Sequence, residues 1–264
     1  MIAVLANFAV AGLGVAAFHI LDLPLPWLLG PITACLIAAL SGVPLKGVKP
    51  LNDGMRTVLG VAVGATLPPP VLATFPAMWP TLALVPVMVA SIGLVGIPYF
   101  LRIWRFDFPT AYYAAMPGGL QDMLAFGEEA GANPRALSLI HATRILLNGI
   151  WQADRSTPPG LPATTIPPHE LAIMVVCALV GWQGAKRIGL FGASILGPLI
   201  LTAVVTLSGF LHYRPPAEAI WAAQFFIGLT IGSKYAGITM AEVRRDLAAG
   251  LGFCVILMVL TLVF

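Results

Sequence analysis

The most informative segment of the sequence is Met116-Pro117-Gly118-Gly119-Leu120-Gln121-Asp122, inside an apolar run over about residues 108–126. Proline removes a backbone donor and the paired glycines free the backbone, so a helix should break here. At membrane depth, a break is tolerated only where it is buried in protein or lines a watery cavity. The stretch therefore predicts a broken or re-entrant helix, provided that the rest of the chain is a membrane protein.

The composition is that of a multi-pass membrane protein. Apolar residues make up 59% of the 264 residues, whereas charged residues make up 9%. A soluble domain carries about 25% charged residues because its surface faces water, so most of this surface should face lipid. Runs long enough to cross a bilayer fall at about 2–20, 25–43, 55–72, 79–101, 108–126, 134–151, 169–185, 190–211, 219–234 and 247–264. We expect an all-α polytopic integral protein of a bacterial-type inner (plasma) membrane, with the first run retained as a helix.

The two halves of the chain repeat each other at an offset of 167 to 168 residues. The recurring pairs are Leu29-Gly30-Pro31 with Leu196-Gly197-Pro198, Ser41-Gly42 with Ser208-Gly209, and Gly60-Val61-Ala62-Val63-Gly64 with Gly228-Leu229-Thr230-Ile231-Gly232. A Gly-x-x-x-Gly pair lets helices approach closely and is a weak motif alone, so the constant offset carries the inference. We predict a first membrane repeat over 1–151, a Pro-rich linker over 152–168 and a second membrane repeat over 169–264.

The positions of the basic residues predict that the repeats are inverted. If every run crossed the membrane, Lys and Arg would divide 7 to 6 between the two faces, with Arg144 set aside inside a helix. If the 108–126 run instead enters and leaves on one face, the division becomes 11 to 2, with Arg155 and Arg214 outside. The positive-inside rule favours the second arrangement. Inverted repeats with a broken element are the pattern of secondary transporters.

Several motifs together resemble one family. They are Pro26-Trp27-Leu28-Leu29-Gly30-Pro31, the Met116 to Met123 segment, Gly131-Ala132-Asn133-Pro134-Arg135 and the run from Leu139 to Leu147. On these motifs the chain resembles the AbrB-type membrane protein family, whose members are often labelled ammonia monooxygenase or AbrB family regulator and are distinct from a small soluble DNA-binding regulator of the same name. The resemblance covers nearly the whole chain and implies a duplicated membrane domain.

One departure from the family pattern concerns the second repeat. The internal offset predicts a second Pro-Gly-Gly segment near position 285, whereas the sequence ends at Phe264. We therefore expect the second repeat to be incomplete, as a natural short form, a truncated gene or a partial chain. We also predict that a second copy of the chain supplies the missing packing, by dimerisation or domain swapping.

The candidate solute-binding residues lie at the break and on the helix that follows it. They are Pro117, Gly118, Gly119, Gln121, Asp122, His141, Arg144 and Asn148. Free N–H groups at the start of the second half-helix would attract an anion. Asp122 either binds a proton or coupling cation or caps that half-helix. The polar stripe of His141, Arg144 and Asn148 either serves the site, with Arg144 pairing Asp122, or staples helices together.

The residue chemistry favours transport over catalysis. We expect no catalytic residues, metal site or cofactor, because the histidines and methionines are scattered and no metal-type spacing appears. The first hypothesis is a secondary-transporter-like protein that moves a small solute, with anions among the candidates. The second is a membrane-embedded regulatory or sensory protein that affects gene expression through partners, and the third is a subunit of an ammonia monooxygenase. The expected partners are the lipid bilayer and a small-molecule solute, without nucleic acid.

Overall fold

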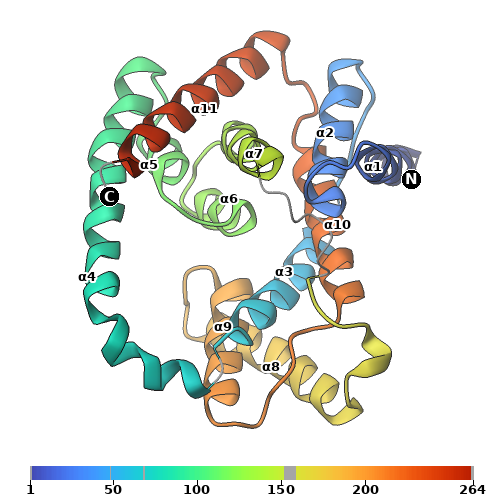
Figure 1. Cartoon of the computed structure of the whole chain (residues 1–264). Coiled ribbons are helices and arrows are strands. Elements are labelled where there is room, and N and C mark those ends of the chain that lie inside the picture. Colours follow the sequence, from blue (N-terminus) through green and yellow to red (C-terminus); the bar gives the residue numbers. More distant parts are fainter. Residues whose placement is uncertain (1, 48, 68, 152–158, 263–264) are drawn as a thin grey trace. The chain divides into compact units, whose positions relative to one another are not determined.

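The computed structural model is all-helical over the residues it describes, which are 2–47, 49–67, 69–151 and 159–262 (Figure 1). Within these ranges, the side chains of residues 2, 49–50, 71–75 and 148–151 are outside the description. The α-helices are α1 (Ile2–Ile20), α2 (Pro26–Leu40), α3 (Lys49–Gly64), α4 (Pro69–Pro98), α5 (Phe108–Ala115), α6 (Leu120–Glu129), α7 (Pro134–Trp151), α8 (Pro168–Arg187), α9 (Ala193–Leu207), α10 (Ala217–Ser233) and α11 (Met240–Thr261). A π-helical turn over Tyr99–Ile103 continues α4, and a 3₁₀ turn covers Ala163–Thr165.

The prediction of an all-α chain is confirmed, and eight of the ten apolar runs each correspond to one helix. The 55–72 run covers most of α3 but extends into the start of α4, so its predicted end was wrong. The 108–126 run is the other exception, because it divides into α5 and α6 at the expected break. Some predicted helix starts were wrong: α3 begins at Lys49, α4 at Pro69 and α11 at Met240, all before their apolar runs. These helices begin in segments rich in charge or proline, which a hydropathy criterion excludes although proline suits a first helical turn.

Contacts divide the chain into two compact units, each described by itself. One consists of Met1–Gly47, Met78–Arg155 and Ile231–Phe264, and the other of Val48–Ala77 and Ser156–Thr230. Each unit therefore takes segments from both halves of the sequence.

The same glycine contact is made once in each unit. A Cβ added at Gly14 of α1 would collide with the backbone carbonyl of Gly30 in α2. In the other unit, a Cβ added at Gly181 of α8 would lie 2.7 Å from the carbonyl oxygen of Gly197 in α9. Gly14 and Gly181 are 167 residues apart, as are Gly30 and Gly197. Both helix pairs therefore pack backbone to backbone, which only glycine permits.

The Gly-x-x-x-Gly helices make a second pair of matching contacts. A Cβ added at Gly64 of α3 would lie 2.8 Å from the Cβ of Thr202 in α9. A Cβ added at Gly232 of α10 would lie 2.5 Å from the Cβ of Cys35 in α2. Cys35 and Thr202 are again 167 residues apart. In each unit, a glycine from one half of the sequence thus packs on the second helix of the other half.

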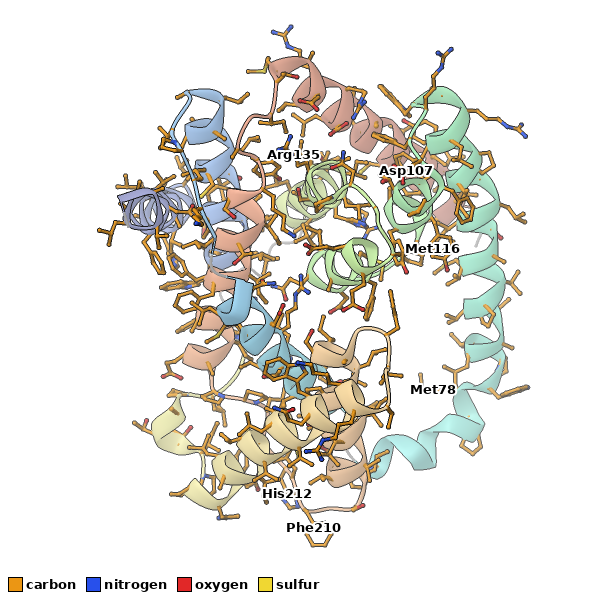
Figure 2. The ribbon with its side chains drawn as sticks, turned by 180° about the vertical axis from the view of Figure 1, so that it is seen from behind. Met78, Asp107, Met116, Arg135, Phe210 and His212 are labelled. Atoms are coloured by element: carbon orange, nitrogen blue, oxygen red, sulfur yellow. The ribbon has the colours of Figure 1, made fainter. Side chains whose placement is uncertain are left out.

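The α5–α6 segment is a helical hairpin whose two ends meet. The Asp107 carboxylate caps α5 by accepting from the backbone N–H of Thr110, 3.2 Å away. The Thr110 hydroxyl in turn accepts from the backbone N–H of Asn133, 2.8 Å away, just before α7 begins. Asp107 and Met116 lie at opposite ends of α5 (Figure 2). Since Asn133 follows the end of α6, the segment turns at the break and returns to its starting level.

Helix α11 packs along α7 and against the end of α4. A Cβ added at Gly250 would lie 3.2 Å from the Cα of Ile140 in α7. The Tyr99 hydroxyl donates to the backbone carbonyl of Ala249 over 3.0 Å. The Thr239 and Glu242 side chains form a capping box at the start of α11. This packing places the C-terminal part of α11 beside the hairpin.

Two of the described helical stretches, Ala3–Ile20 and Pro76–Ile103, are long and apolar enough to cross a membrane. Only 28% of the first stretch and 22% of the second are buried. Leu13 and Leu94 are 71% and 77% exposed. The core helix of a soluble protein would bury such side chains, so this exposure suits helices that face lipid.

Candidate functional site

The helix break has the backbone geometry that its sequence requires. Helix α5 ends at Ala115, and Met116 is extended with φ −64° and ψ 139°. A residue that precedes proline is driven from the helical region by the proline ring, which explains this conformation. Gly119 is also extended, with φ −66° and ψ 143°, and is the N-cap of α6. The chain therefore leaves one helix and starts another within four residues.

His141 satisfies a carbonyl that the proline leaves without a donor. In a continuous helix, the carbonyl of Tyr113 would accept the N–H of residue 117, but Pro117 has none. The Nε2 atom of His141 lies 2.9 Å from this carbonyl oxygen, and the His141 side chain is fully buried. A carbonyl only accepts, so Nε2 carries the hydrogen. The Nδ1 atom has no partner among the described residues.

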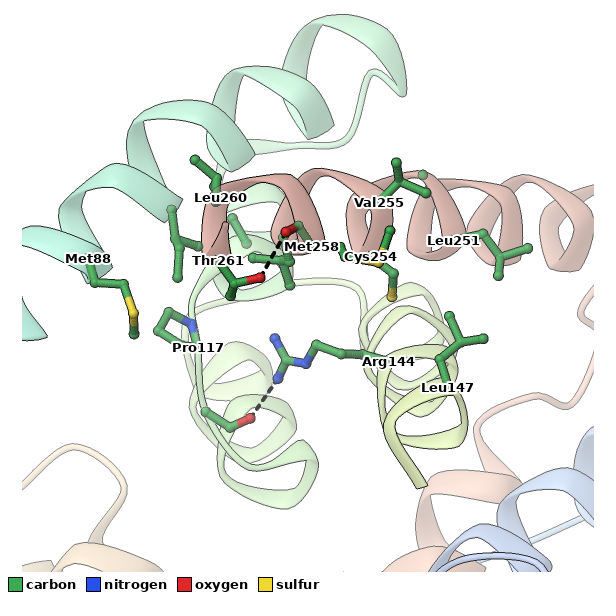
Figure 3. Close-up of a pocket in the computed structure, with 15 residues that line it drawn as sticks. Met88, Pro117, Arg144, Leu147, Leu251, Cys254, Val255, Met258, Leu260 and Thr261 are labelled. Atoms are coloured by element: carbon green, nitrogen blue, oxygen red, sulfur yellow. Dashed lines mark hydrogen bonds between the residues drawn. The ribbon is translucent and has the colours of Figure 1, made fainter. Parts of the chain in front are cut away.

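Arg144 satisfies a second carbonyl on the other side of the break. Its Nη2 atom donates to the carbonyl oxygen of Gly118 over 2.7 Å (Figure 3). Gly118 precedes the N-cap of α6, whose own carbonyl accepts from Met123, so the Gly118 carbonyl receives no donor from that helix. His141 and Arg144 are three residues apart and share a face of α7. Together they hold the two flanks of the break. These contacts are of the structural kind that the sequence analysis gave as one of two alternatives for this polar stripe.

A cavity of about 880 Å³ lies beside the break. Apolar side chains from α4, α7 and α11 make most of its wall, among them Met88, Leu147, Leu251, Leu257 and Met258. Pro117 and Arg144 face each other across it beneath α11 (Figure 3). Arg144 is the single charged residue that lines it within the described part of the chain. The Thr261 hydroxyl also lines the cavity and donates to the carbonyl of Met258 over 2.8 Å.

The structure gathers only part of the predicted set at this cavity. Pro117, Gly118 and Arg144 line it, whereas Gly119, Gln121, Asp122 and His141 are not among the lining residues. The Asn148 side chain lies outside the described residues.

The expected pairing of Asp122 with Arg144 was wrong. Among the described ion pairs none joins them, because Arg144 reaches the Gly118 carbonyl instead. Asp122 is half-buried in the first turn of α6, with its carboxylate close to Gly119. Its negative charge there complements the positive end of the α6 dipole.

One buried carboxylate outside the cavity, that of Glu170, has a structural role. The buried Glu170 accepts from the backbone N–H groups of His212 and Tyr213, at 3.0 and 3.1 Å. Cys35 and Cys177 are buried, and Cys254 is half-buried at the cavity. Across the part of the chain that the structure describes, no three His, Cys, Asp or Glu residues gather in a metal-binding arrangement.

Comparison with known proteins identifies the family. The family model described as "AbrB: Transition state regulatory protein AbrB" matches residues 27–264. The chain belongs to the AbrB family. The resemblance seen in the motifs around the break is therefore confirmed, and the chain is an AbrB family membrane protein.

Two curated relatives cover most of the AbrB chain. "Uncharacterized protein YhjN" of Bacillus subtilis (strain 168) is 25% identical over 92% of this chain and 71% of its own length. "Putative regulator AbrB" of Escherichia coli (strain K12) is 24% identical over 83% of this chain and 65% of its own length. The matched regions thus amount to about two thirds of each relative. No solved structure matches the chain.

Proposed function

We propose that this AbrB family protein is a secondary-transporter-like membrane protein that binds and moves a small anionic solute at the α5–α6 break. The observation that carries the proposal is Arg144, which, of the residues that the structure describes, is the single charged one lining a largely apolar cavity beside a broken helix. An ionised group in such a place is costly and usually functional.

The proposed topology is a pair of inverted repeats in a bacterial inner membrane. The matching glycine contacts at an offset of 167 residues support the duplication. The 11 to 2 division of basic residues supports a hairpin that enters and leaves on the cytoplasmic face. At about 1.5 Å per residue, the eight residues of α5 and ten of α6 would each span roughly 12 to 15 Å, half of a bilayer core. The break would then lie near the midplane, where such transporters bind their solutes.

The two alternative roles of Asp122, one in coupling and one in helix stability, predict different effects of its substitution. As a coupling group, it binds a proton or cation, and Asp122→Asn should abolish uptake driven by an ion gradient while leaving solute exchange intact. As a partner of the helix dipole, it stabilises α6, and the same substitution should lower both activities together with stability. Solute exchange and gradient-driven uptake, measured side by side, separate the two roles.

The rival function is a membrane-embedded regulator or sensor that binds the solute without moving it. The name of the Escherichia coli relative, "Putative regulator AbrB", is the observation that favours it. In that case the cavity would bind a ligand, and partners of the protein would carry the signal to gene expression. A homo-oligomer is part of the proposal for either function, and crosslinking in membranes that yields only monomers would exclude it.

Uptake into proteoliposomes tests the proposed function. We would reconstitute the full chain and measure the counterflow of a panel of radiolabelled small anions, with protein-free liposomes and Arg144→Gln as controls. The proposal expects saturable uptake of at least one anion, reduced at least tenfold by Arg144→Gln. Solute binding without uptake would instead favour the sensor, and stoichiometric copper or iron in the purified protein would favour an oxygenase subunit.

A further inference from the structure

One corner of the cavity is charged, and the rest of its lining is largely apolar. A guanidinium carries five N–H donors, and the contacts of Arg144 with the described residues account for one of them, to the Gly118 carbonyl. Among the described residues, no carboxylate lines the cavity to neutralise this charge. A guanidinium facing an apolar space is costly unless an anion pairs with it, so this corner favours a carboxylate or phosphate group.

The rest of the wall determines the chemical character of the uncharged part of the solute. Leu251, Leu257, Met258 and Met88 present hydrocarbon and thioether groups, which offer no strong hydrogen-bond partners. The hydroxyl of Thr261 is already donated to the carbonyl of Met258. A second charge or several hydroxyl groups on the solute would therefore lose hydration without replacement. About 880 Å³ is also the size of a pocket for a drug-sized ligand, and a bare inorganic anion would leave most of it empty.

From this arrangement we infer that the cavity binds a monoanion with an apolar tail, its anionic group on Arg144 and its hydrocarbon against α4 and α11. The inference rests on the proposed function only in taking the break as the solute site, and it names the class of that solute. Either a free amphiphile, such as a medium-chain carboxylate, or an anionic lipid has this chemistry. The length of tail that fits is set by the residues of α11, not by the break.

Equilibrium binding tests the inference without requiring transport. Radiolabelled octanoate would be titrated onto the full chain in phosphatidylcholine nanodiscs, with empty nanodiscs subtracted. We expect affinity to rise about fourfold per added methylene from butanoate to octanoate, with octanamide and inorganic phosphate at least tenfold weaker. Arg144→Gln should lower octanoate affinity at least tenfold, and Arg144→Lys should lower it less because the charge remains.

A second pair of variants keeps the test valid if Arg144→Gln disturbs the break. Leu257→Trp narrows the cavity and should move the optimum to shorter tails without removing the charge. Val259→Trp is the matched control on the same helix, because Val259 is 56% exposed and is not among the lining residues. The control should keep the wild-type dependence on tail length.

The outcomes separate this inference from the proposed function. Adding phosphatidylglycerol to the nanodiscs identifies the source: unchanged octanoate binding indicates a free amphiphile, and competition indicates an anionic lipid. Affinity that depends neither on tail length nor on Arg144 would overturn the inference, even if other anions are taken up by proteoliposomes. Tail-dependent binding without any uptake would uphold it and count against transport.

Discussion

The guanidinium of Arg144 donates to the backbone carbonyl of Gly118, 26 residues earlier in the chain, over 2.7 Å. One turn before Arg144, His141 makes the corresponding contact with the carbonyl of Tyr113. A single face of α7 therefore holds both flanks of the broken helix. One N–H group of Arg144 supports the break, and the same side chain also lines the cavity. Arg144 therefore has a structural role and a proposed solute-binding role.

The contact between His141 and the Tyr113 carbonyl predicts that substitutions of His141 and Pro117 are energetically coupled. His141→Leu should lower the free energy of unfolding by about 1–3 kcal/mol, because it leaves the Tyr113 carbonyl buried without a donor. Pro117→Ala supplies the N–H that proline lacks, so it should offset about half of this loss or more in the double variant. Denaturant titration of the four proteins in detergent measures the cycle. Equal costs of His141→Leu in both backgrounds would contradict the assignment.

The matched glycine contacts predict position-specific effects in both units. Gly14→Ala and Gly181→Ala should each destabilise by about 1–3 kcal/mol, because the new methyl group would collide with a facing backbone carbonyl. Gly12→Ala and Gly184→Ala are the matched controls on the same helices, since a Cβ there meets nothing within 4 Å. The controls should be neutral or slightly stabilising, since alanine favours helices. Thermal unfolding in detergent measures the stabilities of the four variants. Controls that are destabilised as much as Gly14→Ala and Gly181→Ala would refute this packing.

The capping box of α11 predicts a dependence on pH. Hydrogen bonds from the backbone N–H and hydroxyl of Thr239 hold the pKa of Glu242 below its ordinary value of 4.5. A carboxyl whose pKa is lowered by folding stabilises the protein above its unfolded pKa and loses that contribution as the pH falls through its folded pKa. Stability should therefore fall below about pH 4.5, and Glu242→Gln should remove that part of the fall. Thr239→Ala should cost about 1 kcal/mol near neutral pH.

The proposed re-entrant topology of the α5–α6 hairpin predicts that both of its ends face one side of the membrane. In a Cys254→Ala background, Phe108→Cys and Ala130→Cys should react with an impermeant thiol reagent from the cytoplasmic side. Arg214→Cys should react from the opposite side, where charge counting places it. Labelling of the two hairpin positions from opposite sides would mean that the segment crosses the membrane.

Local sequence signals predicted the broken helix better than they predicted the cavity. The Pro117-Gly118-Gly119 triplet gave the break and, through the helical spacing of His141 and Arg144, the face of α7 that meets it. The walls supplied by α4 and α11 were missed, because plain apolar residues distant in sequence carry no motif that marks them as neighbours. The predicted Asp122–Arg144 pair failed for a related reason. Opposite charge is visible in a sequence, whereas the free carbonyl of Gly118 that takes the guanidinium instead is visible only in the structure.

The most direct test of an anion site at the break uses the native Cys254, which lines the cavity while Cys35 and Cys177 are buried. We would compare the rates at which Cys254 reacts with an anionic and a cationic methanethiosulfonate reagent of similar size, with Cys254→Ala as the control for specificity. We expect the anionic reagent to react faster, octanoate to slow its reaction, and Arg144→Gln to remove both effects. An unreactive Cys254 would contradict an anion site at the break. Reaction rates that depend neither on the charge of the reagent nor on Arg144 would contradict it as well.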